Sequence, residues 1–391
     1  MRGERPTRER PGTRVAVDGG WVVTPDTVFR GGRVVVKGDR IAGVYEHPAE
    51  SPPVDGRVDA AGRYVLPGLV DLHGDDIERY LFPRSGDRVA VDAALVAADR
   101  LTLAAGVTTK FDAVAFENAP EKNRSVETAV EVVDAVARDP GLVADHRVHA
   151  RCEVTDPESV AVVGDVAGRE IVDIVSAMAH APGTGQFEDE TAFERRYADG
   201  RGATTGAVER VGRERAAVGS ATRRQRIADL ATELADAGVV VASHDDSGPA
   251  AVDHAVDNGV DLCEFPLSLA AAERAHERGA ATSMGARKVV RGGSLWGNLD
   301  ARRAVEQGVV DALCSDYRPG AMLAAVFVDT GESLPARVQR VTSAPARIAG
   351  LDDRGRLQAG ARADLVVVDP DPVPTVSRAF VGGTESYRCD S

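Results

Sequence analysis

Val65-Leu-Pro-Gly-Leu-Val-Asp-Leu-His-Gly-Asp75 is the stretch of this chain that decides the fold. An apolar run typical of a buried strand leads directly into a His-x-Asp pair. Alternate residues of a strand face the same side, so His73 and Asp75 can bind one metal ion together. An imidazole and a carboxylate that converge in this way begin a hydrolytic metal site when further ligands arrive from elsewhere in the chain.

Apolar strand candidates alternate with helical stretches beyond this point, which is the pattern of a parallel α/β architecture. Eight candidates occur in the sequence, at residues 65–73, 106–112, 146–154, 171–178, 239–243, 262–266, 280–284 and 312–315. Eight strands with intervening helices favour a TIM-like (β/α)8 barrel over an open sheet. Because active sites of such barrels are built at the strand ends, polar residues there become the candidate site.

Both ends of the chain carry short strand candidates punctuated by Gly and Asp, a pattern of small antiparallel sheets. We therefore expect a small β-sandwich domain assembled from the two termini. Residues 1–63 form its first part in this prediction, residues 64–340 form the barrel, and residues 341–391 return to the sandwich. A long connection at residues 181–237 is an insertion in the barrel.

Four further residues lie at the ends of predicted strands: Glu153, His180, His244 and Asp316. Each alone is more often an ordinary hydrogen-bonded side chain, so the prediction depends on their combination with His73 and Asp75. Three imidazoles and three carboxylates at one barrel mouth can hold two divalent ions, with Glu153 as the bridge. Asp316 is then the expected general base. Mixed nitrogen and oxygen ligands suit zinc and manganese alike.

Several other side chains near strand ends have two interpretations. Lys110 could serve as a carboxylated bridging ligand, although Glu153 is the preferred candidate. Asp245 and Asp246 are alternative ligands or orienting groups, and Asp76 and Glu78 could orient His73. Exposed turn carboxylates are an equally good interpretation of these four residues.

A Gly-rich segment at residues 284–298 combines backbone amides with cationic side chains, which suits phosphate oxygens. Arg291, Ser294 and Asn298 are its candidate substrate-binding residues, and Arg84 adds a possible anion contact after the first strand. Plain loops are the alternative at both places. The arginines of the insertion are expected mostly on solvated helical faces, the alternative being a lid over a polyanionic ligand.

Composition limits the partners. The formal net charge is −14 and only four lysines occur, which disfavours binding to nucleic acid. No segment has the apolar length of a membrane span, and the first residues lack the apolar stretch of a signal peptide. Four scattered cysteines without a CxxC spacing argue against disulfides and thiolate zinc sites. We expect a cytoplasmic protein; the oligomeric state stays open, with a homodimer as one possibility.

These motifs resemble the amidohydrolase superfamily, whose first-strand motif is similar to residues 65–73 and whose return to the β-sandwich is similar to residues 344–351 and 360–369. A narrower resemblance is to the PhnM family, the α-D-ribose 1-methylphosphonate 5-triphosphate diphosphatases of the carbon-phosphorus lyase pathway. It rests on residues 66–79, 179–187, 242–247, 291–294 and 314–317. The resemblance implies metal-dependent hydrolysis of a phosphorylated ribosyl phosphonate to a 5-phosphate and diphosphate, with the six residues named above as metal ligands.

The chain departs from the family pattern at two places. Asp76 stands where the family usually has Asn, and Arg287-Lys288 where it usually has Pro-Asn. The strand count also places His180 and His244 after the fourth and fifth strands, whereas the superfamily usually has them after the fifth and sixth. The alternative function is a cyclic amidase or deaminase on the same fold, which needs a smaller and neutral pocket. A non-catalytic scaffold is the third possibility and would lack the ligands.

Overall fold

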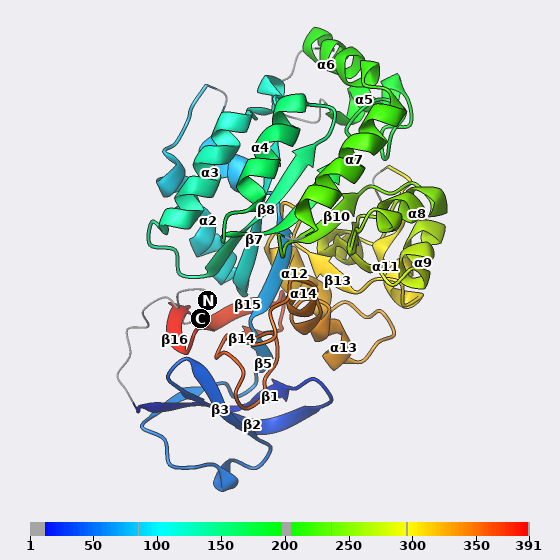
Figure 1. The fold of residues 1–391 in the computed structure, drawn as a ribbon. Coiled ribbons are helices and arrows are strands. Elements are labelled where there is room, and N and C mark those ends of the chain that lie inside the picture. The colour runs from blue at the N-terminus through cyan, green and yellow to red at the C-terminus, as the bar shows by residue number, and fades with distance from the viewer. Residues whose placement is uncertain (1–11, 85, 198–204, 236, 295, 390–391) are drawn as a thin grey trace.

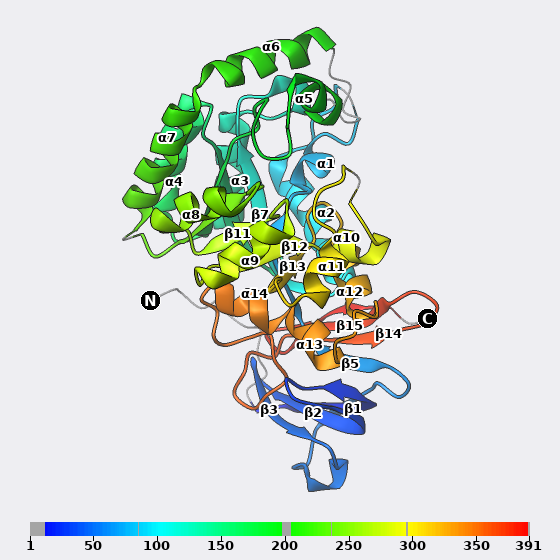
Figure 2. The same ribbon diagram turned by 90° about the vertical axis from the view of Figure 1, so that its right-hand side faces the viewer.

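The computed structural model describes residues 12–84, 86–197, 205–235, 237–294 and 296–389. Its central feature is a parallel sheet of eight strands in sequential order, β6 to β13 (Figures 1 and 2). A parallel bridge between Gly74 and Asp316 joins the last strand to the first and closes the barrel. The strands are β6 (Leu69–Gly74), β7 (Val107–Phe116), β8 (Asp145–Glu153), β9 (Val172–Met178), β10 (Val240–His244), β11 (Leu262–Glu264), β12 (Ala281–Gly285) and β13 (Ala312–Cys314).

The eight strands coincide with the eight predicted candidates, which confirms the fold class. His180 therefore follows the fourth barrel strand and His244 ends the fifth. One boundary differs, because residues 65–73 are divided between two sheets. Pro67 ends a strand of the terminal sheet and β6 begins at Leu69. Gly68 between them packs so closely on the barrel that a Cβ there would lie 2.1 Å from Thr108 Oγ1.

Helices cover the outer face of the barrel (Figure 1). A valine-rich core cluster fills the space between helices and strands, whereas Val70, Leu72 and Phe111 belong to a separate small cluster. The helices are α1 (Ile77–Leu81), α2 (Val91–Ala104), α3 (Val126–Arg138), α4 (Pro157–Ala167), α5 (Glu190–Tyr197), α6 (Thr205–Ala217), α7 (Ser220–Leu234), α8 (Pro249–Asp257), α9 (Leu269–Glu277), α10 (Ala286–Arg291), α11 (Ala301–Glu306), α12 (Gly320–Val326), α13 (Leu334–Gln339) and α14 (Ser343–Ile348), with 3-10 turns η1 (Pro48–Glu50) and η2 (Pro120–Lys122).

Local sequence explains where several helices begin. Ser125 Oγ accepts a hydrogen bond from the Thr128 amide at the start of α3. Asp156 accepts from two amides at the start of α4, where Pro157 occupies the first turn. Both are standard ways to satisfy the free amides of a helix N-terminus. No helix among the described residues is both long and apolar enough to cross a membrane.

The two ends of the chain build one sheet beside the barrel, in the order β16-β15-β14-β5-β1-β2-β3, with β4 paired to β1. Its central contact is the antiparallel pairing of β14 with β5, which places the C-terminal strands against the strand that leads into the barrel. The strands are β1 (Arg14–Val23), β2 (Val28–Lys37), β3 (Arg40–Tyr45), β4 (Gly56–Asp59), β5 (Tyr64–Pro67), β14 (Leu365–Asp369), β15 (Thr375–Val381) and β16 (Thr384–Arg388).

A buried chain of charged groups joins β7 and β8 to helix α2. Lys110 Nζ donates to Asp76 at 2.6 Å and lies 3.0 Å from Asp112. Asp112 also lies 2.7 Å from His146 Nδ1, whose other ring nitrogen is 3.1 Å from Asp99. Lys110 is thus paired with two carboxylates, which argues against Lys110 as a carboxylated bridging ligand. The pairing also balances the charge of Asp76, the residue that departs from the family pattern.

His146 makes stability depend on pH. Burial alone would lower its pKa, but the charge of Asp112 and hydrogen bonds to Asp112 and Asp99 raise the pKa to about 9. Its contribution is fully present below the unfolded pKa near 6.5 and is lost as pH rises through about 9. We expect His146→Gln to lower the free energy of unfolding by about 3 kcal/mol at pH 6 and by much less near pH 10.

Urea unfolding at both pH values measures this difference. The matched control is His47→Gln, because His47 is exposed and its replacement should change stability little at either pH. An equal loss for His146→Gln at pH 6 and pH 10 would contradict the proposed ionic role of this histidine.

Candidate metal centre

A cavity of about 300 Å³ opens at the carboxyl ends of the barrel strands. Side chains from strand ends form its floor, and loops and the insertion form its walls. Among the described residues, those that line it are His73, Asp75, Lys122, Arg124, Arg151, His180, Gln186, Phe187, Arg196, Tyr197, His244, Asp245, Phe265, Arg287, Lys288, Arg291, Gly293, Ser294, Trp296, Asn298, Asp316 and Tyr317. Five of the six predicted metal ligands are in this set, and Glu153 lies beneath it.

The backbone turns sharply where strands meet the cavity. Asp245, Phe265 and Asp316 follow β10, β11 and β13, and all three have positive φ, between 53° and 59°. Such a conformation is unusual for residues other than glycine, above all for a bulky residue such as Phe265. Strained backbone of this kind concentrates at functional sites, where it directs side chains into the site.

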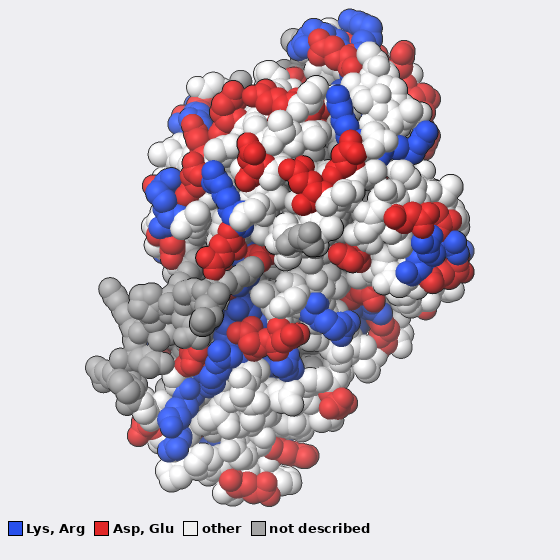
Figure 3. Space-filling view, viewed as in Figure 1, with Lys and Arg blue, Asp and Glu red and all other residues white. Residues whose placement is uncertain are grey.

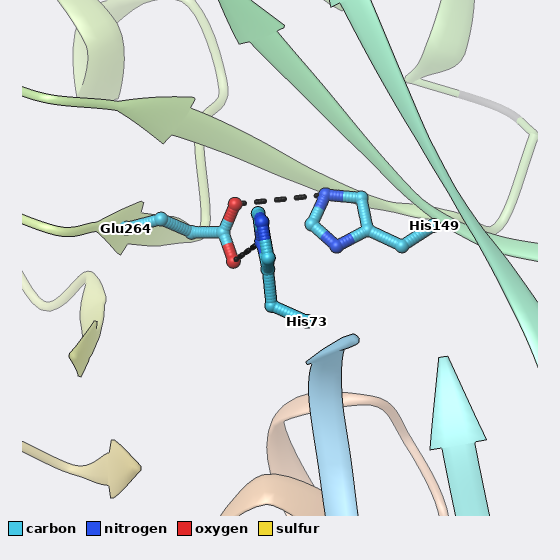
Figure 4. A group of neighbouring side chains, drawn as sticks. All are labelled: His73, His149 and Glu264. Atoms are coloured by element: carbon cyan, nitrogen blue, oxygen red, sulfur yellow. Dashed lines mark hydrogen bonds and ion pairs between the residues drawn. The ribbon is translucent and has the colours of Figure 1, made fainter. Parts of the chain in front are cut away.

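Glu264 faces the imidazole rings of His73 and His149, as Figure 4 shows. It ends β11, the sixth barrel strand, and is fully buried. Its Oε1 accepts a hydrogen bond from His73 Nδ1 at 3.0 Å. Its Oε2 has no hydrogen-bond partner among the described residues, and lies 3.5 Å from His149 Nε2 and 3.7 Å from His244 Nδ1. His73, His149 and Glu264 offer ligand atoms within 4.8 Å of one another.

Three electron-pair donors therefore meet near Glu264 Oε2. His149 Nδ1 lies 2.9 Å from the carbonyl oxygen of Leu72, which can only accept, so Nδ1 carries the proton and Nε2 the lone pair. Burial lowers the pKa of His149 to about 4, which keeps this ring neutral near pH 7. This lone pair lies 2.9 Å from the Ser176 hydroxyl, which can donate to it, and 3.5 Å from Glu264 Oε2, an oxygen without a hydrogen-bond partner among the described residues. The donor set fits a divalent metal ion.

A second group lies beside the first. His180, His244 and Asp245 also offer ligand atoms within 4.8 Å of one another. The His180 and His244 rings are 5.8 Å apart, and His244 stacks over His73 at the same centroid distance. His180 Nδ1 and His244 Nδ1 are buried without a well-aligned hydrogen bond to a described residue. The three predicted histidines are thus brought together at one place.

Asp75 has other partners in the structure. Arg124 donates to its Oδ1 at 2.9 Å and Arg151 donates to its Oδ2 at 2.7 Å. Its neighbour His73 is bound to Glu264 instead. The His-x-Asp pair therefore faces one cavity, but its two side chains belong to different clusters of interactions. Shared binding of one ion by His73 and Asp75 remains a prediction.

Glu153 is enclosed by hydrogen bonds below the cavity. Its Oε1 accepts from the amide and hydroxyl of Thr155, at 3.1 and 2.6 Å. Its Oε2 accepts from Arg215 Nη1 at 3.2 Å and from the His180 amide at 3.1 Å. Burial alone would raise the pKa of Glu153, but the charge of Arg215 and the contacts with His180 lower it to about 2. Glu153 is a charged carboxylate with little free bonding capacity.

Asp316 projects toward the cavity from the loop after the last barrel strand. Its backbone carbonyl accepts from the Asp75 amide at 2.6 Å. Burial raises the pKa of its carboxyl group, and the charge of Asp75 adds to the rise, while His73, Lys288 and Arg151 oppose it. The ligand groups found among the described residues do not include Asp316. A carboxyl group of raised pKa at a cavity wall suits proton transfer.

The insertion is fastened to the barrel mouth by Arg215 of α6. Its guanidinium donates to Glu117 Oε2 at 2.6 Å and to Glu153 at 3.2 Å, and its side chain is 7% exposed. Arg210 and Arg213, by contrast, are exposed and pair with glutamates one turn away. The prediction that these arginines lie on solvated faces is therefore correct for Arg210 and Arg213 and wrong for Arg215. The ion pairs with Glu117 and Glu153 offset the free-energy cost of burying the Arg215 guanidinium.

The predicted substrate-binding residues divide in a similar way. Arg291, Ser294 and Asn298 line the cavity. Arg84 is exposed in the bend after α1, and is not among the described residues that line the cavity.

The predicted orienting groups have other partners. Asp76 pairs with Lys110, Glu78 pairs with Arg124, and Asp246 accepts a hydrogen bond from Ser243. The orienting partner of His73 is Glu264.

Sequence analysis did not single out Glu264, His149 or Arg196. Glu264 carried a usable signal, because it is a carboxylate within the apolar sixth strand candidate, residues 262–266, and the superfamily usually has a histidine ligand after that strand. His149 also carried one, since it lies two and four residues before Arg151 and Glu153 on the same face of a strand. Arg196 carried none, because one arginine among many in a charged helix has no distinguishing pattern.

Comparison with known proteins agrees with the geometry. A model of the amidohydrolase family matches residues 300–377. Among solved structures, molinate hydrolase superimposes with a TM-score of 0.65 at 17% identity, over 96% of this chain and 95% of the other. N-acetyl-D-glucosamine-6-phosphate deacetylase from Mycobacterium smegmatis gives 0.59 at 21% identity, over 96% and 100%. The fold and the site define a hydrolase of the amidohydrolase superfamily.

Sequence similarity is more specific. The α-D-ribose 1-methylphosphonate 5-triphosphate diphosphatase of Escherichia coli K12 is 32% identical over 318 residues, which are 79% of this chain and 84% of that protein. The imidazolonepropionase of Streptomyces coelicolor is 28% identical over 88% of this chain and 87% of its own length. The chain belongs to the PhnM family, that of the ribose 1-methylphosphonate 5-triphosphate diphosphatases.

Proposed function

We propose that this protein hydrolyses α-D-ribose 1-methylphosphonate 5-triphosphate to the corresponding 5-phosphate and diphosphate, in phosphonate catabolism. One observation carries the proposal: a protein with a net charge of −14 gathers cations around the cavity that contains its candidate metal ligands. On the face in Figure 3, acidic side chains are spread widely over the barrel region. The cationic residues of the cavity are Lys122, Arg124, Arg151, Arg196, Arg287, Lys288 and Arg291.

The same observation separates this function from the alternative. A cyclic amidase or deaminase acts on a neutral or weakly charged ring and needs a small pocket without surplus cations. Arg287 and Lys288 lie over the rings of Tyr317 and Phe265 at the cavity wall, at 4.8 and 5.4 Å from the ring centroids. These two residues are a departure from the family pattern, and they add positive charge where a polyanion would bind.

Three groups of described residues offer ligand atoms close enough for one ion, and two of them are neighbouring sets that could hold a pair of divalent ions. His73, His149 and Glu264 form one set and His180, His244 and Asp245 form the other. In the third group, Glu117, Glu153 and His180, both carboxylates are paired with Arg215. Zinc and manganese both accept such nitrogen and oxygen donors. Bound ions would supply two things here, a water molecule of lowered pKa and neutralisation of phosphoryl oxygens. In this assignment Glu264, and not Glu153, is the carboxylate shared by the imidazoles.

The roles of the protein side chains follow from their positions. Water adds to a phosphorus atom of the anhydride that joins the 5-phosphate to the diphosphate, and the bond from that phosphorus to the bridging oxygen breaks. Asp316 takes the proton of the attacking water, because its carboxyl group faces the cavity floor and burial raises its pKa. Cations of the cavity wall stabilise the charge that develops on the leaving diphosphate. Arg124 and Arg151 hold Asp75 in place by charged hydrogen bonds.

Phosphorus NMR of the metal-loaded protein with the ribosyl triphosphate tests the proposal. We expect the triphosphate signals to disappear while those of a phosphate monoester and of diphosphate grow in equal amounts. Imidazolone propionate, the substrate that the name of the Streptomyces relative implies, serves as the comparison substrate and should stay unchanged. An unchanged triphosphate, with the protein folded and carrying metal, would refute the proposed function.

A further inference from the structure

Arg196 presents a buried and incompletely paired guanidinium to the cavity. It lies in α5, the first helix of the insertion, and its side chain is only 5% exposed. Its Nε and Nη1 atoms have no hydrogen-bond partner among the residues that the structure describes. Its Nη2 donates to the carbonyl of Trp296 over 3.4 Å, and the carboxylate of Glu188 is 3.9 Å away and largely exposed. A buried charge with unpaired N–H groups is unfavourable until an anion supplies the missing acceptors.

Three other cations of the cavity have protein partners. Arg124 and Arg151 both bind Asp75, and Lys122 lies 3.9 Å from Glu117 and over the ring of Tyr197. Their charges are therefore largely balanced within the protein. Arg196 differs from them in that its closest carboxylate is distant and solvated. Unlike these three, it can bind a ligand anion without first breaking a close internal ion pair.

The guanidinium of Arg196 is also held in position. It lies over the indole ring of Trp296, 5.4 Å from the ring centroid. Tyr197, the next residue, donates its hydroxyl to Glu121 at 2.8 Å and fixes the end of α5 against the barrel. Because the side chain is already ordered, binding an anion costs little further conformational entropy. The position therefore has both the charge and the rigidity of a built anion site.

We propose that Arg196 binds the terminal phosphate of the substrate's polyphosphate arm and thereby makes the enzyme prefer a triphosphate to shorter chains. This inference rests on the proposed function. The candidate metal ligands end barrel strands, whereas α5 lies over the barrel end farthest from the terminal sheet (Figure 2). A chain cleaved near the barrel strands extends its outer phosphates toward α5. Guanidinium N–H groups are well suited to the several oxygens of a terminal phosphate.

Binding of inorganic diphosphate, the expected leaving group, tests this directly. Isothermal titration of the metal-loaded protein with diphosphate should show 10- to 100-fold weaker binding for Arg196→Ala, the range for losing charge-assisted hydrogen bonds. Arg195→Ala is the matched control, because Arg195 is exposed and lies over the same indole ring at 5.2 Å without lining the cavity. Its diphosphate affinity should change less than twofold. Arg196→Lys should keep part of the affinity.

Two further measurements make the result unambiguous. The melting temperature of ligand-free Arg196→Ala should be equal to or above that of the wild type, because the change removes an unpaired buried charge; a clear fall would overturn the proposal in favour of a structural role. Unchanged diphosphate affinity in Arg196→Ala would also overturn it. So would a variant that binds diphosphate normally but has lost affinity for methyl methylphosphonate, a probe for the other end of the substrate.

If the wild type binds diphosphate through Arg196 but does not cleave the ribosyl triphosphate, the anion site stands and the proposed function fails.

Discussion

Glu264→Gln is expected to lose at least half of the metal that the wild-type protein binds, and its hydrolytic activity with it. The Glu264 carboxylate accepts a hydrogen bond from His73 at 3.0 Å and lies 3.5 and 3.7 Å from ring nitrogens of His149 and His244. An amide offers one neutral oxygen in place of two charged ones, so it binds a divalent ion much more weakly. Metal content per protein molecule, measured by mass spectrometry after exhaustive dialysis, gives the result independently of activity.

Glu153→Gln is the decisive comparison, because the sequence alone favoured Glu153 as the bridging ligand. We expect this variant to keep its metal, since the Glu153 carboxylate is already engaged by Thr155 and Arg215. It should instead lose thermal stability, because Arg215 is left without one of its two acidic partners. Glu131→Gln, a change on an exposed surface, controls for the removal of one charge. Metal loss in Glu153→Gln with metal retained in Glu264→Gln would reverse the assignment.

Asp316→Asn should lower kcat by 10²- to 10⁴-fold, the usual contribution of a general base. The variant is well matched to its position, because Asn adopts the positive φ of 57° found at residue 316 as readily as Asp does. The backbone bridge from residue 316 to Gly74 that closes the barrel involves no side-chain atom and is retained. Release of diphosphate, followed by phosphorus NMR or a coupled assay, measures the loss.

The metal content of Asp316→Asn separates two roles for this carboxylate. We expect near wild-type metal content together with the loss of activity, because Asp316 belongs to none of the ligand groups found among the described residues. Asp246→Asn is a useful control, since Asp246 is a buried carboxylate bound to Ser243 outside the described cavity lining. Robust diphosphate release by Asp316→Asn would remove Asp316 from the base role. If metal content and activity fell together, Asp316 would act primarily as a metal ligand.

Strand pattern made the fold predictable. Each barrel strand is a short apolar run followed by a polar residue, and the regular alternation with helices admits few architectures. The same regularity placed His180 and His244 at the correct strand ends, one strand earlier than the superfamily usually has them. The division of residues 65–73 was not predictable in this way, because β5 and β6 are equally apolar. Only the close packing of Gly68 on Thr108 shows where one sheet ends and the other begins.

Pairing of charged side chains was the part that sequence could not supply. Asp75 and His73 are two residues apart, yet one binds two arginines and the other a glutamate 191 residues away. Arg215 and Arg210 lie one turn and a fraction apart on α6, yet one is buried against the barrel and the other is exposed. Long-range partners decide such outcomes, since a buried charge is tolerated only where an opposite charge meets it.

The sequence by itself therefore determined the barrel, the order of its strands and five side chains at its mouth, namely His73, Asp75, His180, His244 and Asp316, because strand period and strand ends are local properties of the chain. Tertiary structure decided which carboxylate the histidines share, which arginines are neutralised by carboxylates, and that Arg196 lies at the cavity without a close carboxylate among the described residues. These depend on distances between segments far apart in sequence. Electrostatic interactions weaken over a few ångströms, so a small displacement of one side chain decides whether a carboxylate is available as a metal ligand or is used in an ion pair.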